Sequence, residues 1–267
     1  MDGKTSFRKA WEVLFPYLLY YLAYNAALLI VSFLVQLTMQ KGNEAYTDFV
    51  TAHIATITGA AGGLCMIAGI LPLLSMLKRE LQIQAQDGAA QGARVESAER
   101  LPAIVILAVS VSLGLNALFT LTGFAESSQT YQEVADHQYG VAFGVGLVLY
   151  GLISPFTEEV LFRGVIYNRL RRLFGPLVGI VSSGVLFGAF HGNLVQGVYG
   201  TVMGIFIAYL YERSRKFYIP ILFHAVANLA VYTTAYVPAV QETLFTPAGC
   251  AILLTAAVGA VCLERRR

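Results

Sequence analysis

Long apolar stretches alternate with short polar breaks along the 267 residues of this chain. An α-helix needs roughly 20 apolar residues to cross about 30 Å of hydrocarbon, and eight stretches come close to that length. They cover residues 13–38, 49–77, 101–124, 140–157, 173–191, 194–211, 217–240 and 244–263. The pattern predicts an all-α, polytopic membrane bundle of about eight transmembrane helices.

Composition supports insertion into a membrane. Hydrophobic residues make up 57% of the chain and charged residues only 13%, about half the charged share of an ordinary soluble domain. The formal net charge of +2 is too small and too dispersed to indicate a nucleic-acid partner. Three cysteines, Cys65, Cys250 and Cys262, lie in apolar segments without a CxxC pair, so we expect packing residues instead of a disulfide framework or zinc knuckle.

The basic residues lie at the two ends of the chain and in every second polar break between these stretches. Of the 18 lysines and arginines, 17 lie in residues 1–10, 78–100, 163–172, 213–216 and 265–267. The positive-inside rule then predicts eight spans with both termini in the cytoplasm, as suits a bacterial inner membrane. The first stretch is too long for a signal peptide and should remain as a helix.

The chain is expected to have three parts. Residues 1–139 hold the first three transmembrane helices and the cytoplasmic loop 78–100, which is either a flexible linker or a surface helix with no catalytic role. Residues 140–235 hold helices four to seven and the candidate catalytic core. Residues 236–267 hold the last helix and a basic tail.

Glycines spaced four residues apart predict close helix packing. Small residues at this spacing let helix backbones approach each other in lipid. The pattern includes Gly59 and Gly63, then Gly184, Gly188 and Gly192, and finally Gly200 and Gly204.

Two adjacent acids, Glu158 and Glu159, follow the apolar stretch 140–157. An acid within a membrane helix costs at least about 2.5 kcal/mol, so a pair requires a reason. Arg163 lies four residues after Glu159, on the same helix face, whereas Glu158 points about 100° away. We therefore expect an ion pair between Glu159 and Arg163 and a free Glu158 that could act as general base or acid. The alternative is an ordinary solvated helix end.

Two histidines in apolar stretches favour the catalytic interpretation. His191 and His224 follow the acids, and Asn228 lies one turn after His224. Counted from the expected turn at Gly175 and Pro176, Glu158 lies 17 residues back and His191 lies 15 forward. At about 1.5 Å per residue, an antiparallel hairpin places both at nearly the same height.

Such a set of side chains could hydrolyse a peptide bond through activated water. A carboxylate would accept a proton from water, and histidine and asparagine would stabilise the oxyanion. A zinc ion on Glu158, His191 and His224 is also possible in principle, although the HExxH spacing is absent. No GxSxG motif supplies a serine nucleophile, and no aspartate lies in an apolar stretch for an aspartyl pair.

These residues resemble the three motifs of the CAAX prenyl protease and bacteriocin-processing family (CPBP, or Abi). The motifs, which fall within residues 140–232, read Glu158-Glu159-x-x-x-Arg163, Phe187-x-x-x-His191 and His224-x-x-x-Asn228. The resemblance implies an intramembrane endopeptidase with a cavity open toward the cytosol. The family is commonly described as metalloproteases, and a metal-free mechanism has also been argued for it, so the cofactor is zinc or none.

The resemblance also implies a role for each motif residue. Glu158 would activate water with help from His191, and His224 and Asn228 would bind the oxyanion. Three further residues would shape the site: Glu159, Arg163 and Phe187. The expected partners are the lipid bilayer and a peptide or protein substrate, which could be lipid-modified.

Two other classes of function fit the same buried polar residues. A proton- or cation-coupled transporter would also place acids and histidines inside apolar helices. A non-catalytic scaffold or bacteriocin-immunity protein could retain the motif residues without cleaving anything. Loss of peptide cleavage in a Glu158→Gln variant separates the peptidase from both.

Overall fold

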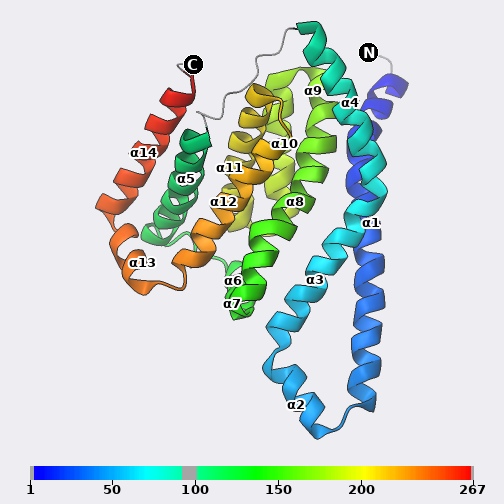
Figure 1. Cartoon of the computed structure of the whole chain (residues 1–267), viewed down its shortest axis with the longest axis vertical. Coiled ribbons are helices and arrows are strands. Elements are labelled where there is room, and N and C mark those ends of the chain that lie inside the picture. The colour runs from blue at the N-terminus through cyan, green and yellow to red at the C-terminus, as the bar shows by residue number, and fades with distance from the viewer. Residues whose placement is uncertain (1–2, 92–100, 266–267) are drawn as a thin grey trace.

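A computed structural model describes residues 3–91 and 101–265, and these residues form helices and connecting turns without any strand (Figure 1). The first part of the chain contains α1 (Gly3–Lys41), α2 (Glu44–Ala52), α3 (Ile54–Ile70), η1 (Leu71–Leu73), α4 (Leu74–Gln91), α5 (Leu101–Leu121) and α6 (Gln129–Gly140). The second part contains α7 (Phe143–Val148), η3 (Leu149–Ile153), α8 (Ser154–Glu159), η4 (Val160–Tyr167), α9 (Asn168–Phe174), α10 (Pro176–Phe190), α11 (Leu194–Ser214), α12 (Tyr218–Thr234), α13 (Pro238–Leu244) and α14 (Pro247–Arg265). The predicted all-α membrane bundle is confirmed.

Each of the eight expected spans corresponds to a helical segment, but their lengths differ. Within the described residues, five helices are long and apolar enough to cross a membrane, and α12 with α13 makes a sixth if this pair, bent by 108°, is one span. The helices α10 and α14 are shorter apolar helices. The count of eight and the cytoplasmic placement of the termini therefore stay predictions.

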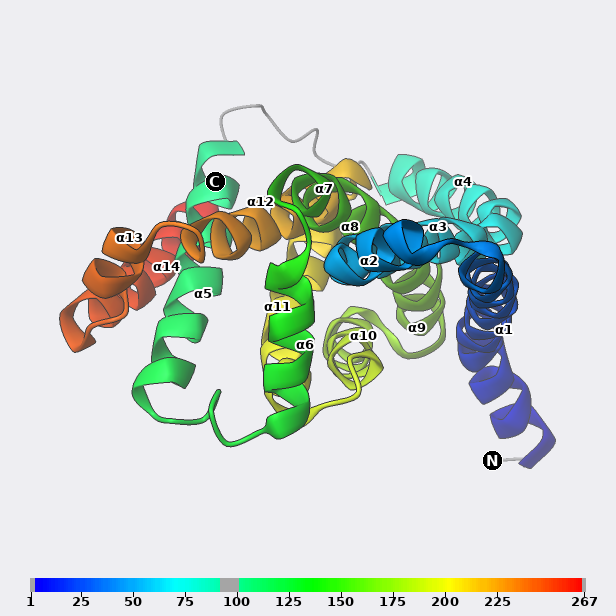
Figure 2. The same cartoon turned by 90° about the horizontal axis from the view of Figure 1, so that it is seen from below.

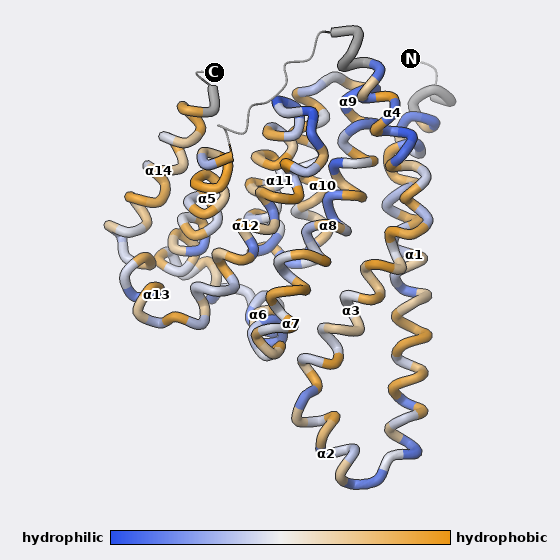
Figure 3. The backbone as a smooth tube through the Cα atoms, in the orientation of Figure 1, coloured by the Kyte–Doolittle hydropathy of each residue, from blue (hydrophilic) through white to orange (hydrophobic). Residues whose placement is uncertain are grey.

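The surface matches a lipid environment. Many large hydrophobic side chains are exposed, among them Leu29, Leu177 and Ile252, each at least 69% exposed. Figure 3 shows hydrophobic residues along most of α1, α5 and α14 and hydrophilic residues along α4. An apolar exterior of this extent is typical of a bundle whose solvent is hydrocarbon.

The segment from Phe143 to Phe174 forms one helical path that carries the first motif. It is not a regular α-helix, because π-helical turns, η3 and η4, lie on either side of the short helix α8. Turns of this kind are rare and occur frequently at functional sites. The chain is therefore helical throughout from Glu158 to Arg163, but its hydrogen-bonding pattern departs from that of a regular α-helix.

The closest helix crossing joins α10 to α11, which contact each other more extensively than any other described pair. A Cβ atom on Gly188 would lie 2.3 Å from the Gly197 carbonyl oxygen, and one on Gly184 would lie 2.9 Å from the Ile205 nitrogen. The predicted glycine packing is confirmed at these positions. It is wrong for Gly192, which ends the helix with a φ of +74° and has open space around its Cα.

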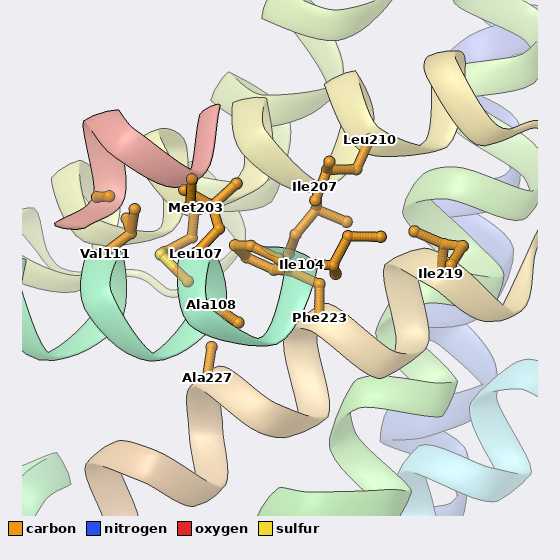
Figure 4. Close-up of a cluster of buried hydrophobic side chains, with 12 residues drawn as sticks. Ile104, Leu107, Ala108, Val111, Met203, Ile207, Leu210, Ile219, Phe223 and Ala227 are labelled. Atoms are coloured by element: carbon orange, nitrogen blue, oxygen red, sulfur yellow. The ribbon is translucent and has the colours of Figure 1, made fainter. Parts of the chain in front are cut away.

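A second apolar core holds α5, α11, α12 and α14 together (Figure 4). Leu107 and Ala108 of α5 meet Met203 and Ile207 of α11, and Phe223 of α12 closes the cluster. This packing fixes α12, which carries the third motif, against α11.

The polar segment after residue 77 continues as a helix, α4, through Gln91, so the surface-helix alternative is correct up to that point. Residues 92–100 lie outside the described residues. Glu80 of α4 is buried and accepts hydrogen bonds from Arg169 Nε at 3.0 Å and Arg172 Nη1 at 2.6 Å. We call this part of the bundle the arginine-rich end, defined by Arg169, Arg171, Arg172 and Arg215.

We predict that Gly188→Val lowers the free energy of unfolding by about 1–3 kcal/mol, because the new side chain pushes α11 away from α10. Thermal unfolding in detergent measures the change. Gly62→Val is the matched control, since a Cβ there meets nothing within 4 Å. Equal unfolding midpoints for both variants would contradict the close crossing.

Candidate active site

Glu158 lies at the end of α8 in a setting almost closed to solvent, with 7% of its surface exposed. Ser154, one turn earlier, donates a hydrogen bond from its hydroxyl to Glu158 Oε1 at 2.5 Å. No lysine or arginine forms an ion pair with Glu158 within the described part of the chain. As expected, Glu158 has no lysine or arginine partner among these residues. Its carboxylate is not free, because the serine hydroxyl binds it and His224 Nε2 lies 3.8 Å away.

Glu159 and Arg163 form the expected ion pair, with 3.0 Å between Arg163 Nη1 and Glu159 Oε1 and no solvent exposure on either side chain. Arg163 Nη2 also donates to the Gly204 carbonyl of α11 at 2.9 Å. A Cβ on Gly204 would lie 3.1 Å from that same nitrogen, so the glycine makes room for the guanidinium. The ring of Phe187 lies 4.6 Å from Arg163 Cζ and covers its face.

His224 makes a contact that the sequence did not predict. Its Nδ1 lies 2.8 Å from Glu159 Oε1, so this one oxygen accepts hydrogen bonds from both Arg163 and His224. A carboxylate only accepts, so Nδ1 carries a proton; Nε2 is an acceptor in the neutral ring and a donor in the imidazolium. That Nε2 lies 3.8 Å from Glu158 Oε2, so His224 lies between the two glutamates.

Two atoms of this network, Glu159 Oε2 and Arg163 Nε, are buried without a hydrogen-bond partner among the described residues. Buried polar atoms in proteins are normally satisfied by protein or by an internal water. One acceptor and one donor of the ion pair therefore remain unpaired among the described residues.

His191 ends α10 and presents its ring to the same space as Glu158. Its Nδ1 lies 2.9 Å from the Phe187 carbonyl oxygen, which can only accept, so in the neutral ring Nε2 is the free acceptor. The ring packs edge-on against Phe187 at 5.1 Å between centroids. The hairpin argument is supported, because Glu158 and His191 line one cavity.

Asn228 lies one turn after His224 on α12 and donates from Nδ2 to the Tyr150 carbonyl at 3.1 Å. Tyr150 belongs to the π-helical turn η3. One amide hydrogen is thus committed to the backbone, and the second hydrogen of the same group is available to the cavity. All four residues proposed as catalytic come together, whereas Glu159 and Arg163 lie behind them as supports.

These side chains line a cavity of about 240 Å³. Its motif residues are Glu158, Phe187, His191, His224 and Asn228. The other lining residues are Asn116, Phe119, Tyr131, Val134, Ala135, Gln138, Tyr139, Tyr150, Ser154, Val195, Gln196, Tyr199, Gly200, Met203 and Val231. Motif reasoning missed the contribution of α5 and α6, because no recognisable pattern marks those residues.

The cavity lies away from the arginine-rich end. Its walls come from the last turns of α5 and α10, the first turns of α11, the middle and last turns of α12, and from α6, η3 and α8. In Figure 1 the α6 and α7 region lies on the opposite side of the bundle from α4 and α9. The expectation of a cavity open toward the cytosol stays a prediction.

The sequence suggested a zinc site made by Glu158, His191 and His224, and the described residues do not show one. In the described ranges, no group of three His, Cys, Asp or Glu side chains is arranged to hold a metal ion. Nε2 of both histidines remains available to a ligand, because Nδ1 of His224 is held by Glu159 and Nδ1 of His191 by a backbone carbonyl, as is usual for metal-bound histidines. In the described ranges the side chains of Glu158, His191 and His224 are nevertheless not arranged as a three-ligand site, and the mechanism below passes no step through a metal.

Comparison with known proteins gives two matches and one negative result. Residues 140–230 match the family model described as type II CAAX prenyl endopeptidase Rce1-like. The chain is also 26% identical over 139 residues to a Bacillus subtilis (strain 168) protein named "Putative membrane peptidase YdiL", covering 45% of this chain and 57% of that relative. No solved structure matches the chain.

The matched segment runs from α7 to α12 and contains every motif residue described above. The chain is accordingly an integral, multi-pass membrane protein whose motif-bearing segment, residues 140–230, is similar to the type II CAAX prenyl endopeptidase Rce1-like family.

Proposed function

We propose that this protein is an intramembrane endopeptidase that cleaves a membrane-associated peptide or protein with water activated by Glu158. The observation that carries the proposal is the meeting of Glu158, His191, His224 and Asn228 in one cavity inside otherwise apolar helices. Ionisable groups are costly in such helices, so their convergence favours a functional site over chance.

In the proposed reaction, water lies between Glu158 and His191. Glu158 accepts a proton from this water, while Nε2 of His191 accepts the second hydrogen as a hydrogen bond and orients the oxygen. The water oxygen bonds to the peptide carbonyl carbon and the carbonyl becomes an oxyanion. Ser154 holds the carboxylate of Glu158 in position during this transfer.

The oxyanion would be stabilised by His224 and Asn228. Asn228 has one amide hydrogen left after its bond to Tyr150. His224 donates from Nε2 when it is protonated, and Glu159 stabilises that positive charge through Nδ1. Glu158 then passes its proton to the leaving nitrogen, the carbon–nitrogen bond breaks, and the products are a new carboxyl group and a new amine.

The proposed location is a bacterial inner membrane, with the arginine-rich end in the cytoplasm as the positive-inside rule implies. Prenylated C-terminal motifs, bacteriocin leaders and other membrane-adjacent peptides are the candidate substrates. The description of the family model names prenyl endopeptidases, and the relative is named as a membrane peptidase.

We expect Glu158→Gln to lower peptide cleavage by about 10²- to 10⁴-fold, because glutamine cannot accept the proton of water. The measurement is single-turnover cleavage of a fluorogenic peptide by purified protein in detergent. Glu242→Gln, an exposed position on α13, serves as control and should cleave like wild type. Unimpaired cleavage by Glu158→Gln would refute the assignment of the base.

Extended dialysis against EDTA should leave the cleavage rate of the wild-type protein unchanged. The reason is that the proposed step needs only the carboxylate and the two histidines, whose arrangement does not form a three-ligand metal site in the described chain. A loss of activity that added zinc restores would instead favour the metal mechanism.

A further inference from the structure

The backbone carbonyl of Tyr150 accepts a hydrogen bond from a side chain because a proline lies where a backbone donor would be. In the π-helical turn η3 the chain bonds five residues back, since the Ser154 nitrogen donates to the Leu149 carbonyl. The next nitrogen in this pattern belongs to Pro155 and would face the Tyr150 carbonyl, but proline has no N–H. Asn228 Nδ2 of α12 donates to this carbonyl at 3.1 Å instead.

The same arrangement occurs a second time, at the arginine-rich end. Pro16 lies inside α1, where an N–H at its position would donate to the Glu12 carbonyl four residues back. Arg169 Nη1 of α9 donates to that carbonyl at 2.6 Å. In both places a proline within a helix leaves a backbone acceptor that binds a polar side chain of another helix.

Close packing brings α12 near enough to η3 for the bond from Asn228. A Cβ on Gly151 of η3 would lie 2.6 Å from Leu229 Cδ2 of α12. A Cβ on Gly146 of α7 would collide with the Tyr232 hydroxyl, also of α12. Two glycines therefore face α12 along this crossing, and the backbone of η3 approaches the helix that carries Asn228.

The bond to Tyr150 sets the direction of the whole Asn228 amide. The two hydrogens of a planar amide group are fixed relative to each other, so holding one of them orients the other. Asn228 lines the cavity together with Glu158 and His191. A donor that is oriented before the reaction stabilises a developing oxyanion without first having to turn toward it.

We propose that Pro155 is a positioning residue for the reaction: because it lacks an N–H, it keeps the Tyr150 carbonyl available to Asn228 and so orients the amide that would bind the oxyanion. This inference rests on the proposed peptidase function. Pro155 is buried, and the described lining of the cavity does not include it, so it acts through Asn228.

The first test restores the missing donor with Pro155→Ala. In a π-helical or an α-helical pattern, the Tyr150 carbonyl then gains a backbone donor that competes with Asn228. We expect kcat for peptide cleavage to fall about tenfold or more with KM unchanged, because the oxyanion forms only in the transition state. Wild-type kcat in this variant would overturn the proposal.

Pro16→Ala is the matched control for this test. It also places an N–H opposite a carbonyl that a side chain occupies, but at the arginine-rich end, and it should cleave like wild type. Pro155→Ser restores the same N–H with a different side chain and should repeat the result of Pro155→Ala. Thermal unfolding of each variant checks that it is folded. An equal loss of kcat in Pro16→Ala would contradict a specific role for Pro155.

A second test separates positioning from a general effect on the structure. Asn228→Ala should lower kcat by about 10²- to 10³-fold, the loss typical of removing one oxyanion donor. Adding Pro155→Ala to Asn228→Ala should cause no further loss, because the amide that Pro155 orients is already gone. A further loss of similar size in the double variant would show that Pro155 acts on another group.

A third test needs no cleavage. In protein labelled with ¹⁵N-asparagine, the side-chain amide signals of Asn228 are identified by their loss from the NMR spectrum of Asn228→Ala. We expect these signals to shift in Pro155→Ala and to stay in place in Pro16→Ala; unchanged signals in Pro155→Ala would overturn the proposal. If wild type cleaves no peptide, the peptidase proposal fails, and the signals still decide whether Pro155 orients Asn228.

Discussion

The structure depends on how an ion pair is held inside apolar helices. Taking a carboxylate or guanidinium out of water costs several kcal/mol per ion, and their attraction offsets this only with good geometry and further hydrogen bonds. Glu159 and Arg163 are fully buried, and their pair is joined by His224 and the Gly204 carbonyl. Three helical segments, η4, α11 and α12, are thereby fixed around one carboxylate.

The rest of the site follows from this arrangement. Arg163 reaches the α11 backbone because Gly204 lacks a side chain, and the glycine crossing of α10 on α11 brings Phe187 over the guanidinium. With His224 held from behind by Glu159, its other nitrogen faces Glu158 across 3.8 Å. A supporting carboxylate and a reacting carboxylate can therefore lie next to each other in the chain and still serve different tasks.

Local sequence relations could be predicted, and distant ones could not. Helical phase predicts the pairing of Glu159 with Arg163, and residue counting across the Gly175 turn predicts that Glu158 and His191 share a height. The bond from His224 to Glu159 joins residues 65 positions apart and depends on how α12 crosses α8, which no local pattern encodes. The π-helical turns and the α6 wall were missed for the same reason, since tertiary packing decides them.

The central claim is that Glu159 acts through His224, and a double-mutant cycle tests it most directly. Cleavage rates of Glu159→Gln, His224→Ala and the double variant are compared with wild type on one peptide, with folding checked by thermal unfolding. If Glu159 serves catalysis by holding His224, the double variant cleaves about as slowly as the slower single variant. Losses that multiply in the double variant would show that the two residues act independently and would contradict the account.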